Sequence, residues 1–245
     1  MKKDLTIPYY GVHAVLQIFA HRKEEIQRVY CLKNKMASIK GLLKWCAENK
    51  KPYHLVEEKD LEKLTDSTHH EGVCCFANPI SSATLDLFFE DIKNKKKVLS
   101  VYLNEVDNPH NLGAILRTLA HFGVTYLFLD HPIRLTPSCC RIAQGGAEHV
   151  KVVYIQHPQD FFTKLKKEGF SLYGTSSHKG QPLQNIAFAP KSMIVMGSES
   201  HGIGKELEKQ LQSWITIAGS NYVESLNVSA ATALLCYGYF AKHGL

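Results

Sequence analysis

The stretch NPHNLGAILRTLAHFG, residues 108–123, predicts an amphipathic helix that begins behind a polar turn. Asn108 followed by Pro109 is typical of a helix N-terminus, because asparagine caps free amides and proline suits the first helical position. Arg117 lies on a different face of this helix from the apolar residues, among small and apolar neighbours. A desolvated arginine there would require an anionic partner, and the alternative is an ordinary surface arginine. The apolar residues expected to face a core are Leu112, Ile115, Leu116, Leu119 and Phe122.

Residues 98–245 alternate apolar, strand-like runs with helical segments. Such alternation favours a parallel sheet covered by helices on both faces, in which ligands bind beyond the carboxyl ends of the strands. The turns that follow the strands are therefore expected to carry the chemistry. The predicted strands are Val98–Leu103, Val124–Leu129, Val152–Ile155, Leu172–Thr175, Met193–Met196 and Ile215–Ile217.

A second informative turn is MIVMGSESHGIG, residues 193–204, which leaves a predicted strand and is rich in glycine. A Walker A loop would need a glycine where this chain has Glu199, and the GxGxxG dinucleotide fingerprint is absent. An acidic side chain in the loop would repel phosphate. The segment therefore suits a neutral or cationic ligand better than a polyphosphate, unless it is an ordinary strand-to-helix turn.

A third turn is ESLNVSAATALLCYGYF, residues 224–240, which predicts a helix from Leu226 to Ala241. Ser225 or Asn227 could cap this helix. Because the helix is apolar on nearly every side, it must be covered either by its own sheet or by a second copy of the chain.

The first part of the chain predicts a smaller α/β unit. We expect an N-terminal domain over residues 1–78, a linker over 79–97 and a C-terminal domain over 98–245. The predicted helices are His13–Ala20, Ile39–Asn49 and Lys59–Leu64, and the predicted strands are Arg28–Leu32, Tyr53–Val56 and Val73–Ala77.

The composition indicates a folded protein with a mild preference for anionic partners. The chain has 245 residues, 44% of them hydrophobic, and a formal net charge of +6, of which +4 lies in residues 1–97 (17 Lys and Arg against 13 Asp and Glu). The seven cysteines form no CxxC pair and are expected to be small buried residues, and no His or Cys spacing indicates a metal site. No stretch indicates a signal peptide or a membrane span, so we expect a cytoplasmic protein.

In their order and spacing, the three turn segments resemble the motifs of the SpoU (TrmH-type) branch of the SPOUT RNA methyltransferases. YYGVHAVLQIF (residues 9–19) and HHEGVCCFA (residues 69–77) resemble the substrate-binding domain of RlmB-type members, a small α/β domain of the ribosomal-protein-L30 type. HHEGV and VESLNVS are most similar to YfiF-type members. The resemblance, which covers nearly the whole chain, implies a parallel sheet with a trefoil knot. It also implies a homodimer built on the C-terminal domains.

The same resemblance implies transfer of a methyl group from S-adenosylmethionine to a ribose 2′-hydroxyl of RNA. The family modifies both ribosomal and transfer RNA, and the extra N-terminal domain favours ribosomal RNA (23S), with transfer RNA left open. One departure concerns the loop after the sixth strand, where many relatives have Ile-Pro-Met and this chain has Ile217-Ala218-Gly219. In the family that loop lines the adenine of the cofactor. By matching motif positions, Gly197, Ile217 and Leu226 would contact the cofactor. Thr175, Ser176 and Ser198 are further expected cofactor contacts. The reaction site would comprise Asn111, Arg117, Glu199, Ser225 and Asn227.

Two roles for Arg117 are open. A guanidinium keeps its proton above about pH 12, which makes it a poor base. We favour a positioning role, in which Arg117 binds the neighbouring phosphate and orients the hydroxyl while phosphate or water takes the proton. Direct proton removal by a perturbed Arg117 is the alternative.

The sequence leaves two other classes of function to consider. A non-catalytic RNA-binding paralogue would keep the fold without turnover, and only the altered loop at Ala218 and Gly219 favours it. A nicotinamide-dependent oxidoreductase on a Rossmann sheet is disfavoured by the missing glycine fingerprint.

Overall fold

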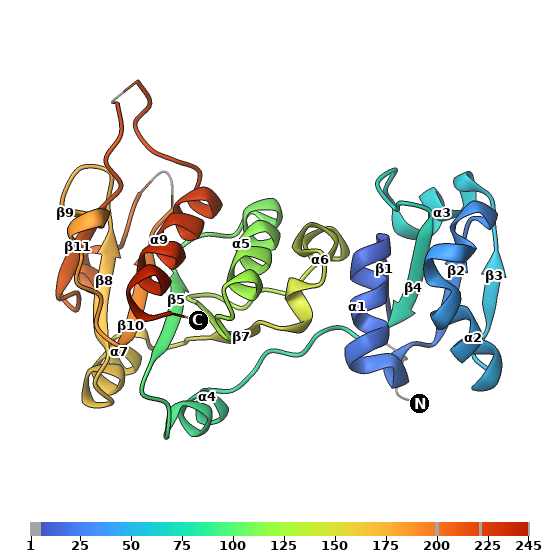
Figure 1. Cartoon of the computed structure of the whole chain (residues 1–245), viewed down its shortest axis with the longest axis horizontal. Helices are drawn as coiled ribbons and strands as arrows, with labels where there is room; N and C mark the ends of the chain where they lie inside the picture. Colours follow the sequence, from blue (N-terminus) through green and yellow to red (C-terminus); the bar gives the residue numbers. More distant parts are fainter. Residues whose placement is uncertain (1–5, 199–200, 221, 245) are drawn as a thin grey trace. The chain divides into compact units, whose positions relative to one another are not determined.

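The computed structural model describes residues 6–198, 201–220 and 222–244 (Figure 1). The chain forms two compact units. Unit 1 comprises the residues up to Ser81 together with Arg134–His149, and unit 2 comprises Ser82–Ile133 together with the residues from Val150 onward.

Unit 1 is built on a four-stranded sheet with the strand order β1-β4-β2-β3. β4 pairs antiparallel with β1 and β2, and β2 pairs parallel with β3. The sequence predicts three of these strands but not β1, which contains Pro8. The strands are β1 (Ile7–Tyr10), β2 (Arg28–Cys31), β3 (Tyr53–Leu55) and β4 (Val73–Ala77). The α-helices are α1 (Val12–Arg22), α2 (Lys40–Glu48), α3 (Glu58–Thr65) and α6 (Pro137–Ala143).

The two faces of this sheet are covered differently. On one face the cross-strand pair Val29 and Cys75 is fully buried, on the side of α1 and α2. On the opposite face, α3 packs Leu61 against Tyr10 and Cys74. The face on the side of α1 and α2 therefore carries fully buried side chains, whereas α3 covers only part of the opposite face.

Residues 134–149 belong to unit 1, although the expected division placed them in the C-terminal domain. A bidentate ion pair holds them there: the Arg22 guanidinium donates to both carboxylate oxygens of Glu148, at 2.8 and 3.1 Å. The two side chains are only 12% and 7% exposed, so the pair is largely shielded from water. This contact joins positions 126 residues apart, which local sequence patterns do not reveal.

Unit 2 contains a seven-stranded sheet with the order β7-β6-β5-β10-β8-β11-β9, and each of its strand pairings is parallel. The predicted α/β class with a parallel C-terminal sheet is confirmed, whereas the trefoil knot stays a prediction. The two-residue strand β9 is not indicated by the sequence. The strands are β5 (Val98–Leu103), β6 (Tyr126–Leu129), β7 (Lys151–Tyr154), β8 (Ser171–Thr175), β9 (Gln181–Pro182), β10 (Lys191–Met196) and β11 (Ser213–Thr216).

The helices α5 and α9 of unit 2 lie side by side (Figure 1). The C-terminal ends of the two helices meet through Phe122 and Phe240, whose rings stack with centroids 5.7 Å apart. The Asn108 side chain accepts from the His110 amide at 2.9 Å, which confirms the predicted cap of α5. The α-helices of unit 2 are α4 (Leu85–Ile92), α5 (Pro109–His121), α7 (Pro158–Lys167), α8 (Lys205–Glu208) and α9 (Val228–His243).

The segment expected to be a linker, residues 79–97, contains α4 and contributes to the core of unit 2. Phe88 is fully buried, and its ring centroid lies 5.0 Å from that of Tyr126 and 4.9 Å from that of Phe128. The predicted linker therefore differs from the structure, because an amphipathic helix with one buried aromatic face lies within it.

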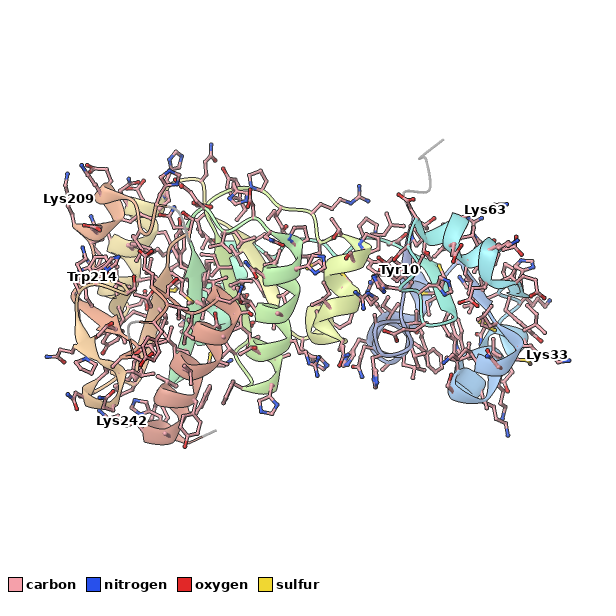
Figure 2. All side chains as sticks on the ribbon, turned by 90° about the horizontal axis from the view of Figure 1, so that it is seen from above. Tyr10, Lys33, Lys63, Lys209, Trp214 and Lys242 are labelled. Carbon is pink, nitrogen blue, oxygen red and sulfur yellow. The ribbon has the colours of Figure 1, made fainter. Side chains whose placement is uncertain are left out.

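All seven cysteines are buried thiols, as predicted. Burial raises the pKa of Cys236 to about 12, so this thiol stays protonated at neutral pH. By contrast, Lys33 and Lys63 project from the surface of unit 1, and Lys209 and Lys242 from that of unit 2 (Figure 2). Within the described ranges, no helix has the length and apolar character needed to cross a membrane.

If α4 belongs to the core of unit 2, Phe88→Ala should lower the free energy of unfolding of this unit by about 3–5 kcal/mol. The change removes a fully buried ring and leaves a cavity. The measurement is urea unfolding in a Trp45→Phe background, where Trp214 alone reports on unit 2.

Leu87→Ala is the matched control, because Leu87 lies on the same helix and is 37% exposed. Equal losses for the two variants would show that α4 does not anchor the core.

Candidate functional site

A cavity of about 500 Å³ lies in unit 2 beyond the carboxyl ends of β8, β10 and β11. These strands are parallel neighbours in the sheet, so the segments that follow them meet at one edge. The lining comes from residues 175–179 after β8, from residues 196–198 and 201–203 around the turn after β10, and from residues between Trp214 and Leu235. The sequence predicted that the turns after strands would carry the site, and the cavity lies there.

All six residues predicted to contact a cofactor line this single cavity. They come from three segments that are separate in the sequence. Their role in binding a ligand stays a prediction. The six are Thr175, Ser176, Gly197, Ser198, Ile217 and Leu226.

The turn after β10 is so tightly folded that glycine is required at its start. A Cβ atom at Gly197 would overlap with the backbone carbonyl group of Gly202. Gly202 itself has a φ of 66° and donates its amide to the Ser198 carbonyl oxygen at 2.9 Å. Glycine at positions 197 and 202 therefore allows the two backbone segments of this turn to lie in close contact on the cavity wall.

Asn104, the residue directly after β5, holds the end of this turn at Gly204. The sequence did not predict this role. Its side-chain oxygen accepts from the Gly204 amide at 2.8 Å, and its side-chain nitrogen donates to Asp130 at 2.6 Å. Asn104 is 7% exposed, so its polar atoms need these partners. The available signal was its position: a polar residue directly after a buried strand.

The cavity mouth carries two contacts between a basic and an acidic side chain that the sequence did not predict. The His178 Nε2 atom lies 3.1 Å from a carboxylate oxygen of Glu224. The Lys179 ammonium group lies 3.1 Å from Glu208 and 3.7 Å from the ring centroid of Trp214, which Figure 2 labels. Each of these two basic side chains faces a carboxylate, so His178 and Lys179 are not available as unpaired cations for a polyphosphate.

Two of the predicted reaction residues are joined directly. The Asn227 side-chain oxygen accepts from the Ser229 amide at 2.9 Å, so Asn227 is the cap of α9, one of the two predicted candidates. Its side-chain nitrogen donates to the Asn111 side-chain oxygen at 2.9 Å. Ser225, two residues before the cap, lines the cavity and is exposed. The starts of α5 and α9 therefore meet beside the cavity.

Arg117 is not brought to the same place. It is exposed, and six helical residues rotate it about 240° around the α5 axis from Asn111. The desolvated environment that its apolar neighbours suggested is absent in the single chain, because Ile115 and Leu116 point into the core. Glu199 lies outside the described residues.

Comparison with known proteins identifies this arrangement. Residues 98–237 match the model of the SpoU rRNA Methylase family, and residues 9–83 match that of the RNA 2′-O ribose methyltransferase substrate binding domain. The chain belongs to the SpoU methyltransferase family. The predicted family and the two-part architecture are thereby confirmed.

Three similar proteins illustrate the relationship. The chain is 31% identical to an uncharacterized tRNA/rRNA methyltransferase, YfiF of Escherichia coli O157:H7, over 92% of this chain and 65% of that protein, so it spans just under two thirds of that relative. It is 30% identical to the 23S rRNA (guanosine-2′-O-)-methyltransferase RlmB of Acinetobacter baylyi over 94% of each. The SpoU methyltransferase AviRb from Streptomyces viridochromogenes, solved in complex with AdoMet, shares the fold with a TM-score of 0.77 at 16% identity, covering 97% of this chain and 90% of that one.

The tight turn predicts that Gly197→Ala destabilises unit 2. The new methyl group would displace the Gly202 backbone, and overpacking of this kind costs about 1–3 kcal/mol. The measurement is the urea midpoint followed through Trp214 fluorescence in the Trp45→Phe background.

Gly219→Ala provides the comparison, since Gly219 follows β11 near the same cavity and a Cβ atom there would meet nothing within 4 Å. If both variants unfold at the same urea concentration, the close approach at Gly197 does not support the cavity wall.

Proposed function

We propose that this chain transfers a methyl group from S-adenosylmethionine to a ribose 2′-hydroxyl of RNA. The observation that carries the proposal is the single cavity lined by all six predicted cofactor residues, beside the linked pair Asn111 and Asn227. Membership of the SpoU family and the match to the substrate-binding model support the same reaction.

The lining of the cavity fits this cofactor. Its volume of about 500 Å³ is within the usual range for small-molecule sites. Ile217, Leu226 and Leu235 offer apolar surface for an adenine ring, and the hydroxyls of Thr175 and Ser198 offer polar partners for a ribose or an amino acid group. When bound, S-adenosylmethionine supplies an electrophilic methyl group on a sulfonium, a cation that the carboxylates of Glu208 and Glu224 in the lining tolerate.

The residues around the cavity would orient the nucleophile. A ribose hydroxyl is a weak nucleophile that must lose its proton as it attacks. The hydrogen bond from Asn227 fixes the Asn111 amide, whose own nitrogen can then donate to a substrate oxygen. Arg117 is exposed and would hold the phosphate next to the target ribose, in the positioning role that we favour over proton removal.

We further propose ribosomal RNA as the substrate, rather than transfer RNA. The name of the matched family model and that of the RlmB relative support this choice. The test is mapping of 2′-O-methyl positions in total RNA from cells with and without the gene, with loss of a ribosomal position as the expected result. Loss of a transfer RNA position would assign the other substrate, and no change at all would contradict the enzymatic proposal.

The main alternative is a non-catalytic RNA-binding paralogue. The observation behind it is the sequence Ile217-Ala218-Gly219, where many relatives have Ile-Pro-Met; Ile217 lines the cavity, and Ala218 and Gly219 are exposed beside it. Titration calorimetry with S-adenosylmethionine separates the two proposals. We expect binding of one cofactor per chain, and no detectable binding would favour the paralogue.

We also propose that the protein is a homodimer through unit 2. The surface of α9 carries an apolar stripe at helical spacing, in which Leu234 is 40% and Tyr237 is 64% exposed. Ala230 and Ala241 extend it in both directions. A second copy of the chain would cover this stripe, in line with the sequence-based expectation that α9 must be covered.

The dimer proposal predicts that Leu234→Glu together with Tyr237→Glu converts the protein to a monomer. Two carboxylates in an apolar interface would lose hydration without gaining partners. Light scattering at micromolar concentration measures the mass, and Leu87→Glu, an exposed apolar position on α4, serves as control. A monomeric unmodified protein would exclude the dimer.

The positioning role predicts that Arg117→Ala abolishes methyl transfer without changing cofactor affinity. Losing a charged hydrogen bond to phosphate costs about 1.5–3 kcal/mol, and a misplaced hydroxyl costs more. Cofactor affinity should hold because Arg117 does not line the cavity. Single-turnover methylation and calorimetry on the same preparation measure both quantities.

Arg117→Lys distinguishes the two mechanisms. A lysine keeps the charge but loses the two parallel N–H donors with which a guanidinium binds phosphate. We therefore expect weak activity that requires a higher RNA concentration. This activity should change little between about pH 7 and about pH 10. A steep rise of the lysine variant towards the usual lysine pKa of about 10.4 would instead indicate proton removal at this position.

A further inference from the structure

One face of the sheet in unit 1 carries a group of aromatic and cationic side chains that the methyl transfer site does not use. We name it the stacking face and define it by Arg28 and Tyr30 of β2, His54 of β3 and Phe76 of β4. The register places Tyr30 opposite His54, and Arg28 opposite Phe76. Because side chains alternate along a strand, these four lie on the same face.

The four side chains contact one another in series. The rings of His54 and Tyr30 are stacked, with centroids 5.1 Å apart and an angle of 24° between planes. Tyr30 meets Phe76 edge-on at 5.8 Å. The Arg28 guanidinium carbon lies 4.2 Å from the centroid of the Phe76 ring. The result is a continuous row of flat groups that crosses three strands.

The row is accessible to solvent and is not simply part of the buried core. The helix α3 packs on the neighbouring part of the same face through Leu61, against Tyr10 and Cys74. By contrast, Arg28 and His54 are exposed, and Tyr30 and Phe76 are half-buried. His54 comes from β3, the edge strand of the sheet, so its exposed ring is the last in the row.

The charge along the face is uneven. Lys50 and Lys51 precede β3 at the end where Arg28 begins β2, since the two strands are parallel and Val29 donates to the Pro52 carbonyl oxygen at 3.1 Å. At the Arg28 end, Glu24 and Glu25 precede β2, and Glu25 is paired with Arg22. Four carboxylates lie at the opposite end, on and before α3. They are Glu57, Glu58, Asp60 and Glu62. A polyanion is therefore favoured at the Arg28 end of the row.

We propose that the stacking face binds unpaired nucleotides of the RNA substrate, with bases stacked on the His54 and Tyr30 rings and a phosphate held by Arg28. Aromatic side chains stack on bases that are free of a helix, and cationic groups beside them hold the backbone. A duplex hides the faces of its bases and offers nothing to the rings. The inference deepens the proposed function and rests on RNA being the substrate.

The test compares binding of the full chain to two fluorescent RNAs, an unpaired oligonucleotide of roughly ten nucleotides and a duplex of the same length. Fluorescence anisotropy at low and at physiological salt gives the affinities. We expect His54→Ala and Arg28→Gln each to weaken binding of the unpaired RNA about 5- to 100-fold, with little effect on the duplex. His54→Phe should restore the affinity, because it keeps a flat ring.

Tyr53→Ala is the matched control. Tyr53 is the adjacent residue of the same strand, is 42% exposed, and points to the opposite face of the sheet. Its removal should leave RNA affinity unchanged. An equal loss for Tyr53→Ala and His54→Ala would overturn the proposal, because the effect would then not belong to one face.

The remaining outcomes separate this inference from the proposed function. If the wild-type chain binds RNA and the His54 and Arg28 variants bind it equally well, the stacking face is wrong and the methyl transfer proposal stands. If these variants change only the oligomeric state in light scattering, the face is a protein contact and the proposal is overturned. A wild-type chain that binds S-adenosylmethionine in calorimetry but neither RNA would overturn the RNA proposal and the stacking face together.

Discussion

The parallel pairing of β10 with β5 on one side and β8 on the other is the constraint on which the rest of unit 2 depends. Parallel strands end at the same edge of a sheet, so the turns after β8, β10 and β11 have no other place to meet. The turn after β10 must then fold back tightly, which excludes any side chain at Gly197. Asn104 holds this turn from β5, and the cavity lies in the space that remains between the three turns.

The sequence predicted those parts of the fold that depend on residues close together in the chain, such as apolar runs and helix caps. Apolar runs located six of the strands of unit 2, and Asn108 with Pro109 located the start of α5. The parts that were missed depend on contacts between distant positions. Nothing near residue 148 indicates that Glu148 pairs with Arg22, so the membership of residues 134–149 in unit 1 could not be foreseen.

The same distinction applies to the candidate site. Family motifs selected six residues that the structure gathers around one cavity, because those motifs occupy the turns whose positions the sheet dictates. The contacts of His178 with Glu224 and of Lys179 with Glu208 were not predicted, because each joins two separate segments of the chain rather than lying within one motif. For Arg117 the structure shows the exposed alternative in the single chain: apolar neighbours in sequence do not imply an apolar environment, since on a helix they point elsewhere.

The first 81 residues cannot be deleted without breaking contacts of residues 134–149, which lie between two segments of unit 2 in the sequence. The chain passes between the units at residues 81–82, 133–134 and 149–150, and the middle excursion leaves unit 2 between β6 and β7. Without the first 81 residues, Glu148 would lose both hydrogen bonds from Arg22, and α6 would lose its contact with β1. A partner removed from a shielded ion pair leaves an uncompensated charge, which is costly. Residues 134–149 therefore connect the two units: they pack in unit 1, whereas in the sequence they lie between two segments of unit 2.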